Sequence, residues 1–179
     1  RRYPGIYWNC LISILASSFL VTGLAVTGIF QLQPWFTPQY LIPLLGMVLG
    51  NTLNGISLAL DRFLDDLQKQ RDLVETRLCL GASAWEASHD LLRSALRTGL
   101  IPSINSMAVM GVVSLPGMMT GQILAGVNPG EAVRYQMVIV FMITAAATLG
   151  TVIVLLFAFR VLFSTRHQLL LNRLSAKQD

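Results

Sequence analysis

The chain has 179 residues with a formal net charge of +4, and 54% of the residues are hydrophobic whereas only 12% are charged. A soluble domain usually carries about 25% charged residues, so this composition excludes an ordinary soluble enzyme and favours a membrane protein. Three stretches, residues 3–60, 98–130 and 135–159, contain no Asp, Glu, Lys or Arg. Because a spanning helix needs roughly 20 apolar residues, they predict about four membrane helices in one all-α, polytopic bundle domain over residues 1–179.

The first two predicted spans cover residues 6–30 and 40–60, and an uncharged turn with prolines at 34 and 38 joins them. In the second span, Asn51 and Asn54 are three residues apart and therefore share one face of a helix. Because buried amides need partners, this face is predicted to point into the bundle or a cavity rather than toward lipid. Hydrogen bonding between helices and contact with a substrate explain the pair equally well.

Residues 61–97 form the only strongly charged segment, in which both signs are mixed. Leucine and valine recur there at helical spacing, which predicts that the second span continues out of the membrane as an amphipathic helix. Gly81 is predicted to interrupt this helix. The sequence Ser83-Ala84-Trp85-Glu86 is typical of a capping box at the start of the next helix, which runs toward Gly99 and Pro102. We call the whole segment the elbow.

The third predicted span, residues 100–124, contains most of the sequence SLPGMMTGQILAG at residues 114–126. Pro116 removes a backbone donor and Gly117 adds backbone freedom, so a straight helix is not expected. In hydrocarbon, a broken helix is tolerated only where protein or a water-filled cavity satisfies the freed backbone groups, so this segment is predicted to line a pathway. The predicted gate or pathway residues are Ser114, Pro116, Gly117, Met118, Met119, Thr120, Gly121 and Gln122, together with Asn51 and Asn54.

The adjacent Met118 and Met119 have two possible roles. Thioethers are soft ligands that suit soft or borderline metals rather than ferric iron. Methionine is also a common gap-filler in helix packing, and we favour packing for this pair. Gln122 and Asn51 offer oxygen atoms, but no set of residues makes a convincing coordination sphere. No metal site and no cofactor are therefore predicted.

The fourth predicted span covers residues 132–159, and a basic tail follows at residues 160–179. If the elbow and the tail are cytoplasmic, Arg1 and Arg2 lie on the same side. Arg134 is then alone on the opposite side among thirteen basic residues. This positive-inside distribution predicts that both ends of the chain face the cytoplasm.

Several kinds of chemistry are missing from the sequence. There is no phosphate-binding G-x-x-x-x-G-K-[ST] motif, no zinc signature and no G-x-S-x-G. His89 and His167 lie outside the predicted spans, as do all the acidic residues, so no intramembrane carboxylate offers a proton relay. An intramembrane enzyme is therefore not expected. Cys10 and Cys79 fall in different environments, which argues against a disulfide.

The elbow sequence VETRLCLGASAW, residues 74–85, resembles the cytoplasmic loop by which ABC-transporter permeases dock on their ATP-binding subunit. That loop has a glutamate, then small residues, with a glycine six positions after the glutamate. Thr76 and Arg77 depart from it, because small residues are usual there. The residues matched to the coupling loop are Glu75, Arg77, Gly81, Ala82, Ser83 and Trp85. Together with SLPGMMTGQILAG, they closely resemble FetB-like (UPF0014-type) iron-export permeases over nearly the whole chain, including NTLNG at 51–55 and STRHQLL at 164–170.

The resemblance implies a homodimeric permease in the bacterial inner membrane, paired with a separate ATP-binding subunit and moving iron. It also implies two or three further spans upstream of this chain. A permease of the same type for another solute, such as a nucleotide sugar, is the first alternative. A membrane scaffold or channel without an ATPase is the second. The lipid bilayer and a small solute are expected partners, and nucleic acid is not.

Overall fold

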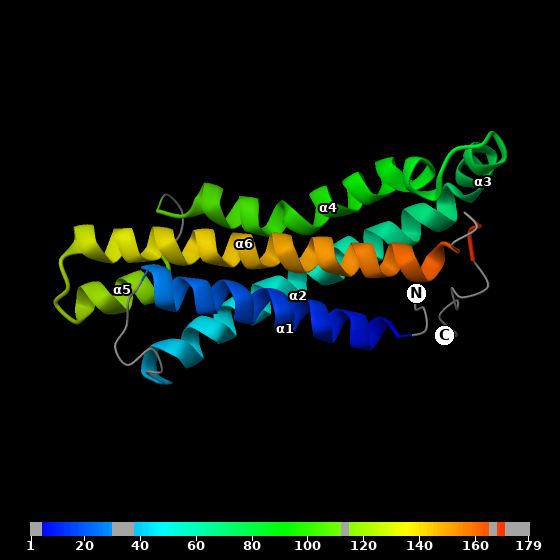
Figure 1. Cartoon of the computed structure of the whole chain (residues 1–179). Helices are drawn as coiled ribbons and strands as arrows, with labels where there is room; N and C mark the ends of the chain where they lie inside the picture. The colour runs from blue at the N-terminus through cyan, green and yellow to red at the C-terminus, as the bar shows by residue number, and fades with distance from the viewer. Residues whose placement is uncertain (1–4, 30–37, 112–114, 165–167, 171–179) are drawn as a thin grey trace, which may run out of the picture.

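The structure is a computed structural model that describes residues 5–29, 38–111, 115–164 and 168–170. These residues form a helical bundle with an isolated β-bridge between Phe163 and Leu169, which confirms the predicted all-α class (Figure 1). The helices are α1 (Ile6–Leu24), continued by the π-helix η1 (Ala25–Ile29), α2 (Pro38–Lys69), α3 (Arg71–Cys79), α4 (Ala84–Val109), α5 (Gly117–Leu124) and α6 (Pro129–Leu162).

Within the described residues, three segments are long and apolar enough to cross a membrane, namely Ile6–Gly28, Leu41–Lys69 and Pro129–Leu162. They correspond to the first, second and fourth predicted spans. The third predicted span differs, because residues 100–124 are not one helix. Its first half is the end of α4, which continues from the elbow through Gly99 and Pro102, and its second half is the short helix α5. The count of four spans therefore stays a prediction.

The long helices lie roughly along one direction, with α3 at one end of the bundle and α5 at the other (Figure 1). Helix α6 packs against α1, α2, α4 and α5, and α2 packs against α1, α4 and α6. Helix α1 begins and α6 ends at the α3 end. This end is called the elbow end below, and the opposite end is called the α5 end.

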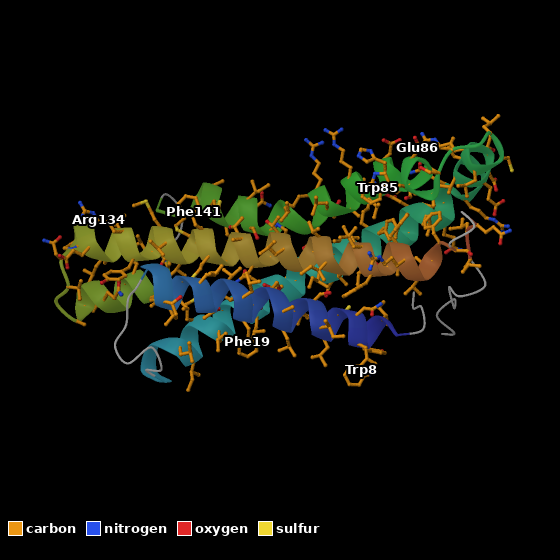
Figure 2. The ribbon with its side chains drawn as sticks, viewed as in Figure 1. Trp8, Phe19, Trp85, Glu86, Arg134 and Phe141 are labelled. Atoms are coloured by element: carbon orange, nitrogen blue, oxygen red, sulfur yellow. The ribbon has the colours of Figure 1, made fainter. Side chains whose placement is uncertain are left out.

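Two hydrophobic clusters hold the helices together. The larger one, toward the elbow end, is centred on Phe63, Leu67 and Leu162, and the smaller one, toward the α5 end, on Val48 and Ile139. Outward-facing apolar side chains are also abundant along the helices, including Trp8, Phe19 and Phe141 (Figure 2). An apolar exterior combined with a packed interior is the pattern that a lipid-embedded bundle requires.

Small residues allow α2, α4 and α6 to approach each other closely. A Cβ atom added to Gly99 of α4 would lie 2.8 Å from the carbonyl oxygen of Gly55 in α2 and 3.1 Å from Thr151 in α6. A Cβ on Gly150 of α6 would lie 2.7 Å from Thr52 in α2. Glycine at such positions lets membrane helices pack backbone against backbone. These contacts fix where the three helices cross.

Candidate functional site

The elbow turn is built around a left-handed glycine. Gly81 has φ of 93°, its N–H donates to the carbonyl of Leu78 (3.1 Å), and the N–H of Ala82 donates to the carbonyl of Arg77 (3.1 Å). This pair of bonds closes the end of α3, and the φ value favours glycine because other residues have a Cβ clash there. The prediction that Gly81 interrupts the helix is confirmed. Leu80, next to it, is 83% exposed.

The predicted capping box at the start of α4 is present. The backbone N–H of Ser83 donates to Glu86 Oε2 (2.8 Å), and the N–H of Glu86 donates to Ser83 Oγ (3.3 Å). Ser83 Oγ also donates to Glu86 Oε2 (2.7 Å). The side-chain and backbone hydrogen bonds from Ser83 lower the pKa of the Glu86 carboxyl. The turn therefore enters α4 with a fixed geometry.

We expect Ser83→Ala to make amide hydrogen exchange at the start of α4 about fivefold faster, because loss of an N-cap serine costs about 1 kcal/mol. Since the pKa of Glu86 is lowered by folding, its contribution is complete above its unfolded pKa and is lost as pH falls through the folded pKa. Wild-type protection should therefore fall in acid toward the level of the variant. Ser106→Ala, an exposed position within α4 and not at its cap, is the control. Equal exchange in wild type and Ser83→Ala would contradict the role of the cap.

Ion pairs fix the two helices of the elbow. Arg71 Nε pairs with Glu75 Oε1 at 2.8 Å within α3, and Arg77 Nη1 pairs with Asp90 Oδ2 at 3.0 Å across the turn to α4. The hydrogen bond and charge of Glu75 raise the pKa of the Arg71 guanidinium. The predicted coupling residues Glu75 and Arg77 thus both have partners within the chain. Of the two ion pairs, only Arg77–Asp90 connects α3 to α4, whereas Arg71–Glu75 lies within α3.

Trp85 links the elbow to the end of α6. Its ring meets the ring of Phe159 edge to face at a centroid distance of 5.7 Å, and Phe159 in turn packs on Phe163 at 5.0 Å. Trp85 is nevertheless 47% exposed, and Figure 2 shows it at the elbow end near Glu86. One face of the elbow is therefore attached to the bundle, while Leu80 and part of Trp85 are left for another contact.

At the α5 end, the chain leaves the helical conformation just before the predicted breakers. Helix α4 ends at Val109, Met110 is extended, and Gly111 has a left-handed φ of 80°. Pro116 is the N-cap of α5, where its carbonyl accepts the N–H of Thr120 (3.0 Å), and Gly117 is the first residue of α5. Ser114 lies outside the described residues. Pro116 and Gly117 thus begin a new helix, and Gly111, which the sequence did not single out, carries the backbone turn.

The remaining predicted pathway residues do not converge on one point. Met118 packs against the cluster around Val48, whereas Met119 is buried and faces a different space. Gly121 is exposed, and Gln122 is half-buried. Met118 thus packs on this cluster and Met119 is buried at another place, and the role of the pair stays a prediction.

Within the described part of the chain, Asn51 and Asn54 do not both point into the bundle, so the prediction that their face meets the bundle or a cavity stays a prediction. Asn51 is half-buried and donates from Nδ2 to the carbonyl of Met47 (2.8 Å), while Asn54 is exposed. The reason lies in the neighbouring residues. Thr52 and Gly55 face α4 and α6 at the close helix crossing, which turns the bulkier Asn54 outward.

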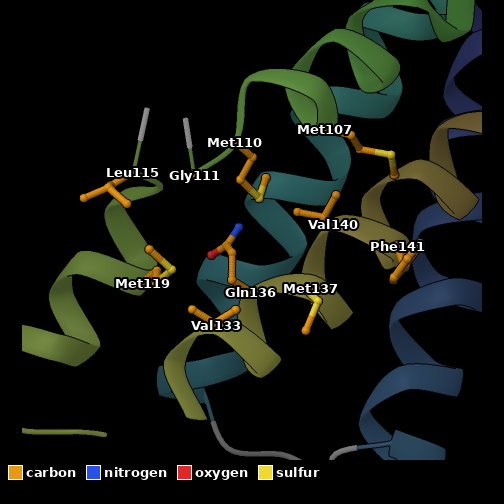
Figure 3. Close-up of a pocket in the computed structure, with 10 residues that line it drawn as sticks. All are labelled: Met107, Met110, Gly111, Leu115, Met119, Val133, Gln136, Met137, Val140 and Phe141. Atoms are coloured by element: carbon orange, nitrogen blue, oxygen red, sulfur yellow. The ribbon is translucent and has the colours of Figure 1, made fainter. Parts of the chain in front are cut away.

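A pocket of about 500 Å³ opens beside the break between α4 and α5 (Figure 3). Its walls come from the end of α4, from the segment leading into α5, from α5 itself and from the start of α6. The lining residues are Met107, Met110, Gly111, Leu115, Met119, Val133, Gln136, Met137, Val140 and Phe141. Sequence reasoning found only Met119 among them, because the other side chains are brought together by the packing of α6 against α5.

Comparison with known proteins gives consistent results. The model of the uncharacterised protein family UPF0014 matches residues 1–163. The UPF0014 membrane protein slr1647 of Synechocystis is 45% identical over 94% of this chain and 65% of its own length. The probable iron export permease protein FetB of Escherichia coli is 36% identical over 79% of this chain and 55% of its own length.

A plant protein is similar as well. The protein ALUMINUM SENSITIVE 3 of Arabidopsis thaliana is 35% identical over 94% of this chain and 61% of its own length. The chain thus spans between 55% and 65% of the length of these three relatives. No solved structure matches the chain significantly. The family model covers nearly the whole chain, and the relatives agree with it. The chain therefore belongs to the UPF0014 family of membrane proteins.

Proposed function

We propose that this chain is the membrane-spanning permease subunit of an ABC transporter that exports iron, and that a separate ATP-binding subunit docks on the elbow. The observation that carries the proposal is the elbow itself. A rigid, capped turn projects beyond the bundle and presents the apolar Leu80 and the half-exposed Trp85 to a partner. Exposed apolar and aromatic side chains on a rigid turn are typical anchors of an interface.

The route from the elbow to the α5 end supports coupling. Helix α4 has 26 residues and runs from the capping box to Val109 as one element. Its far end forms one wall of the pocket beside α5. A displacement of the elbow by the ATP-binding subunit would therefore move this wall. Two such permease chains and two ATP-binding subunits would form the complete transporter.

The same arrangement supports an orientation in the membrane. The charged elbow, the start of α1 and the end of α6 lie at one end of the bundle, while Arg134 lies at the other (Figure 2). Because Lys and Arg concentrate on the cytoplasmic side, the elbow end faces the cytoplasm. An ATP-binding subunit would meet the elbow there, and the α5 end would face the opposite side of the inner membrane.

Leu80→Asp is expected to abolish co-purification of the ATP-binding subunit, because it puts a charge in the centre of the proposed interface. Loss of an interface hot-spot residue typically costs about 2 kcal/mol of binding free energy, which raises the Kd of the complex by about 30-fold. Glu75→Lys should weaken the complex as well, since it replaces the attraction to Arg71 by repulsion. Leu124→Asp is the matched control, since Leu124 is also 83% exposed but lies at the α5 end.

The outcome decides the class of protein. If both elbow variants retain the ATP-binding subunit, docking on the elbow is wrong. If no ATP-binding subunit co-purifies even with the wild type, the alternative of a scaffold or channel is favoured.

The solute is assigned from the relatives rather than from the residues. The printed name of the Escherichia coli relative refers to iron export, and that of the Arabidopsis relative to aluminium sensitivity. Both names concern metals, which favours a metal over the alternative of a nucleotide sugar. In a strain without the gene, raised cellular iron with unchanged nucleotide-sugar pools would support iron export, and the reverse would contradict it.

A further inference from the structure

Methionines are concentrated around the pocket at the α5 end. The chain has seven methionines, and four of them, Met107, Met110, Met119 and Met137, line this one space. They come from the end of α4 and the residue that follows it, from α5 and from the start of α6. Methionine commonly fills gaps in helix packing, yet these four side chains border an open space of about 500 Å³. Their arrangement therefore calls for an occupant.

Gln136 supplies a second and independent observation. Its side chain is 8% exposed, and within the described part of the chain its Oε1 atom has no hydrogen-bond partner. A buried acceptor without a partner costs free energy and requires an explanation. Figure 3 shows the Gln136 amide pointing toward the space between Met110 and Met119. An occupant that accepts a lone pair from this oxygen would satisfy it.

The chemistry of the lining restricts the occupant. Among the lining residues that the structure describes, the polar and polarisable groups are neutral thioethers and one amide, with no carboxylate, histidine or cysteine. Neutral thioethers select soft cations such as Cu(I), whereas carboxylates and waters suit hard ones. The cost of taking an ion out of water grows with the square of its charge, so a pocket of neutral ligands favours a monovalent ion.

We propose that this pocket binds a soft monovalent metal ion, Cu(I) or its analogue Ag(I), through the sulfur atoms of Met110 and Met119, with Gln136 Oε1 as a weaker third ligand. The inference goes beyond the proposed iron export and does not depend on an ATP-binding subunit. Met107 and Met137 complete the soft surroundings at the margin of the site (Figure 3).

The test is a silver titration of the full-length protein in lipid nanodiscs, with ¹³C-labelled methionine methyl groups observed by NMR. We expect the methyl signals of Met110 and Met119 to shift at one equivalent of Ag(I). The signals of Met47, outside the pocket lining, and of Met142, buried in the cluster around Val48, should stay in place. Fe(II) should not reproduce the shifts, because thioethers discriminate against it.

Variants locate the ligands. The double variant M110L/M119L should lower Ag(I) affinity by on the order of 100-fold, and Gln136→Leu by about tenfold, since thioether sulfur provides most of the binding. Met142→Leu is the matched control. Leucine conserves the volume of methionine, so the bundle should remain folded in each variant.

Two results would overturn the proposal. One is an absence of methyl shifts or equal shifts at all methionines, which would mean that the pocket is only an apolar cavity. The other is unchanged affinity in M110L/M119L. Neither result bears on docking at the elbow, which is measured by co-purification, so the two proposals fail separately.

Discussion

Replacing Gly99 by leucine is expected to prevent formation of the folded bundle. A Cβ atom at this position would lie 2.8 Å from the carbonyl oxygen of Gly55 and 2.8 Å from the Cβ of Ala59. Both atoms are fixed to the backbone of α2, so no flexible side chain can move aside. Overpacking of a core typically costs 1–3 kcal/mol, and here the cost should exceed about 3 kcal/mol because two whole helices must separate.

The measurement is the yield of monodisperse protein in detergent, followed by its thermal unfolding temperature. Gly50→Leu is the matched control, because Gly50 also lies in a membrane helix but has no atom within 4 Å of an added Cβ. Gly99→Ala should give an intermediate loss. A Gly99→Leu protein that unfolds at the wild-type temperature would show that α2 and α4 do not cross at this point.

The features that depend only on residues adjacent in the sequence could be predicted. The capping box at Ser83 and Glu86 is a local pattern, and so is the interruption at Gly81. The length of the charge-free stretches predicted a helical membrane protein, because the thickness of the bilayer sets the length of a spanning helix. These predictions need no knowledge of which helices touch.

The boundary of the third predicted span could not be found in this way. Gly99 and Pro102 weaken a helix on local grounds, yet α4 continues through both. Gly99 stays within the helix because α4 crosses α2 at Gly55 and the crossing leaves no room for a side chain at position 99. This is a tertiary contact that the local sequence does not show. The break instead follows Val109, where Gly111 takes a left-handed conformation that no local pattern had marked.

The candidate pocket was even less visible in the sequence. Met119 belongs to the conspicuous methionine pair, but Gln136 and Met137 lie 17 and 18 residues further along the chain, in the next helix, and appeared as ordinary residues of the last span. Only the hairpin from α5 to α6 brings them opposite Met110. A glutamine in a predicted membrane helix is the one local signal that could have pointed to this face, since such residues usually turn away from lipid.

The two ends of the molecule have complementary roles in the proposed transporter. At the elbow, the Arg77–Asp90 ion pair and the capping box connect α3 to α4, so in the proposed transporter a displacement of the elbow by a partner would be passed on to α4. At the α5 end, Met110 and Gly111 leave the helical conformation between two helices. In the proposed transporter, a continuous α4 that ends at this change of backbone conformation could move the pocket wall without unfolding the bundle. In this proposal Gly111 is therefore the hinge of the gate, and Pro116 fixes the start of α5.

Gly111→Ala is expected to slow ATP-driven transport by about tenfold in proteoliposomes that contain the complete transporter. Gly111 has φ of 80°, and a residue with a Cβ atom adopts this left-handed conformation at a free-energy cost of about 1–2 kcal/mol. Alanine should therefore lower the population of this conformation by roughly 5- to 30-fold. Co-purification of the ATP-binding subunit should be unchanged, because Gly111 lies at the end of α4 remote from the elbow. Gly117→Ala should have a small effect, since Gly117 is helical and has open space around it.

Gly5→Ala is the control for backbone strain alone. Gly5 has φ of 87° and open space around it, like Gly111, but it lies at the start of α1, at the elbow end. If Gly5→Ala slowed transport as much as Gly111→Ala, the effect would be one of general stability. If Gly111→Ala transported at the wild-type rate, the break between α4 and α5 would not be a hinge. A slow Gly111→Ala beside a normal Gly5→Ala would place the moving part of the permease at the methionine-lined pocket.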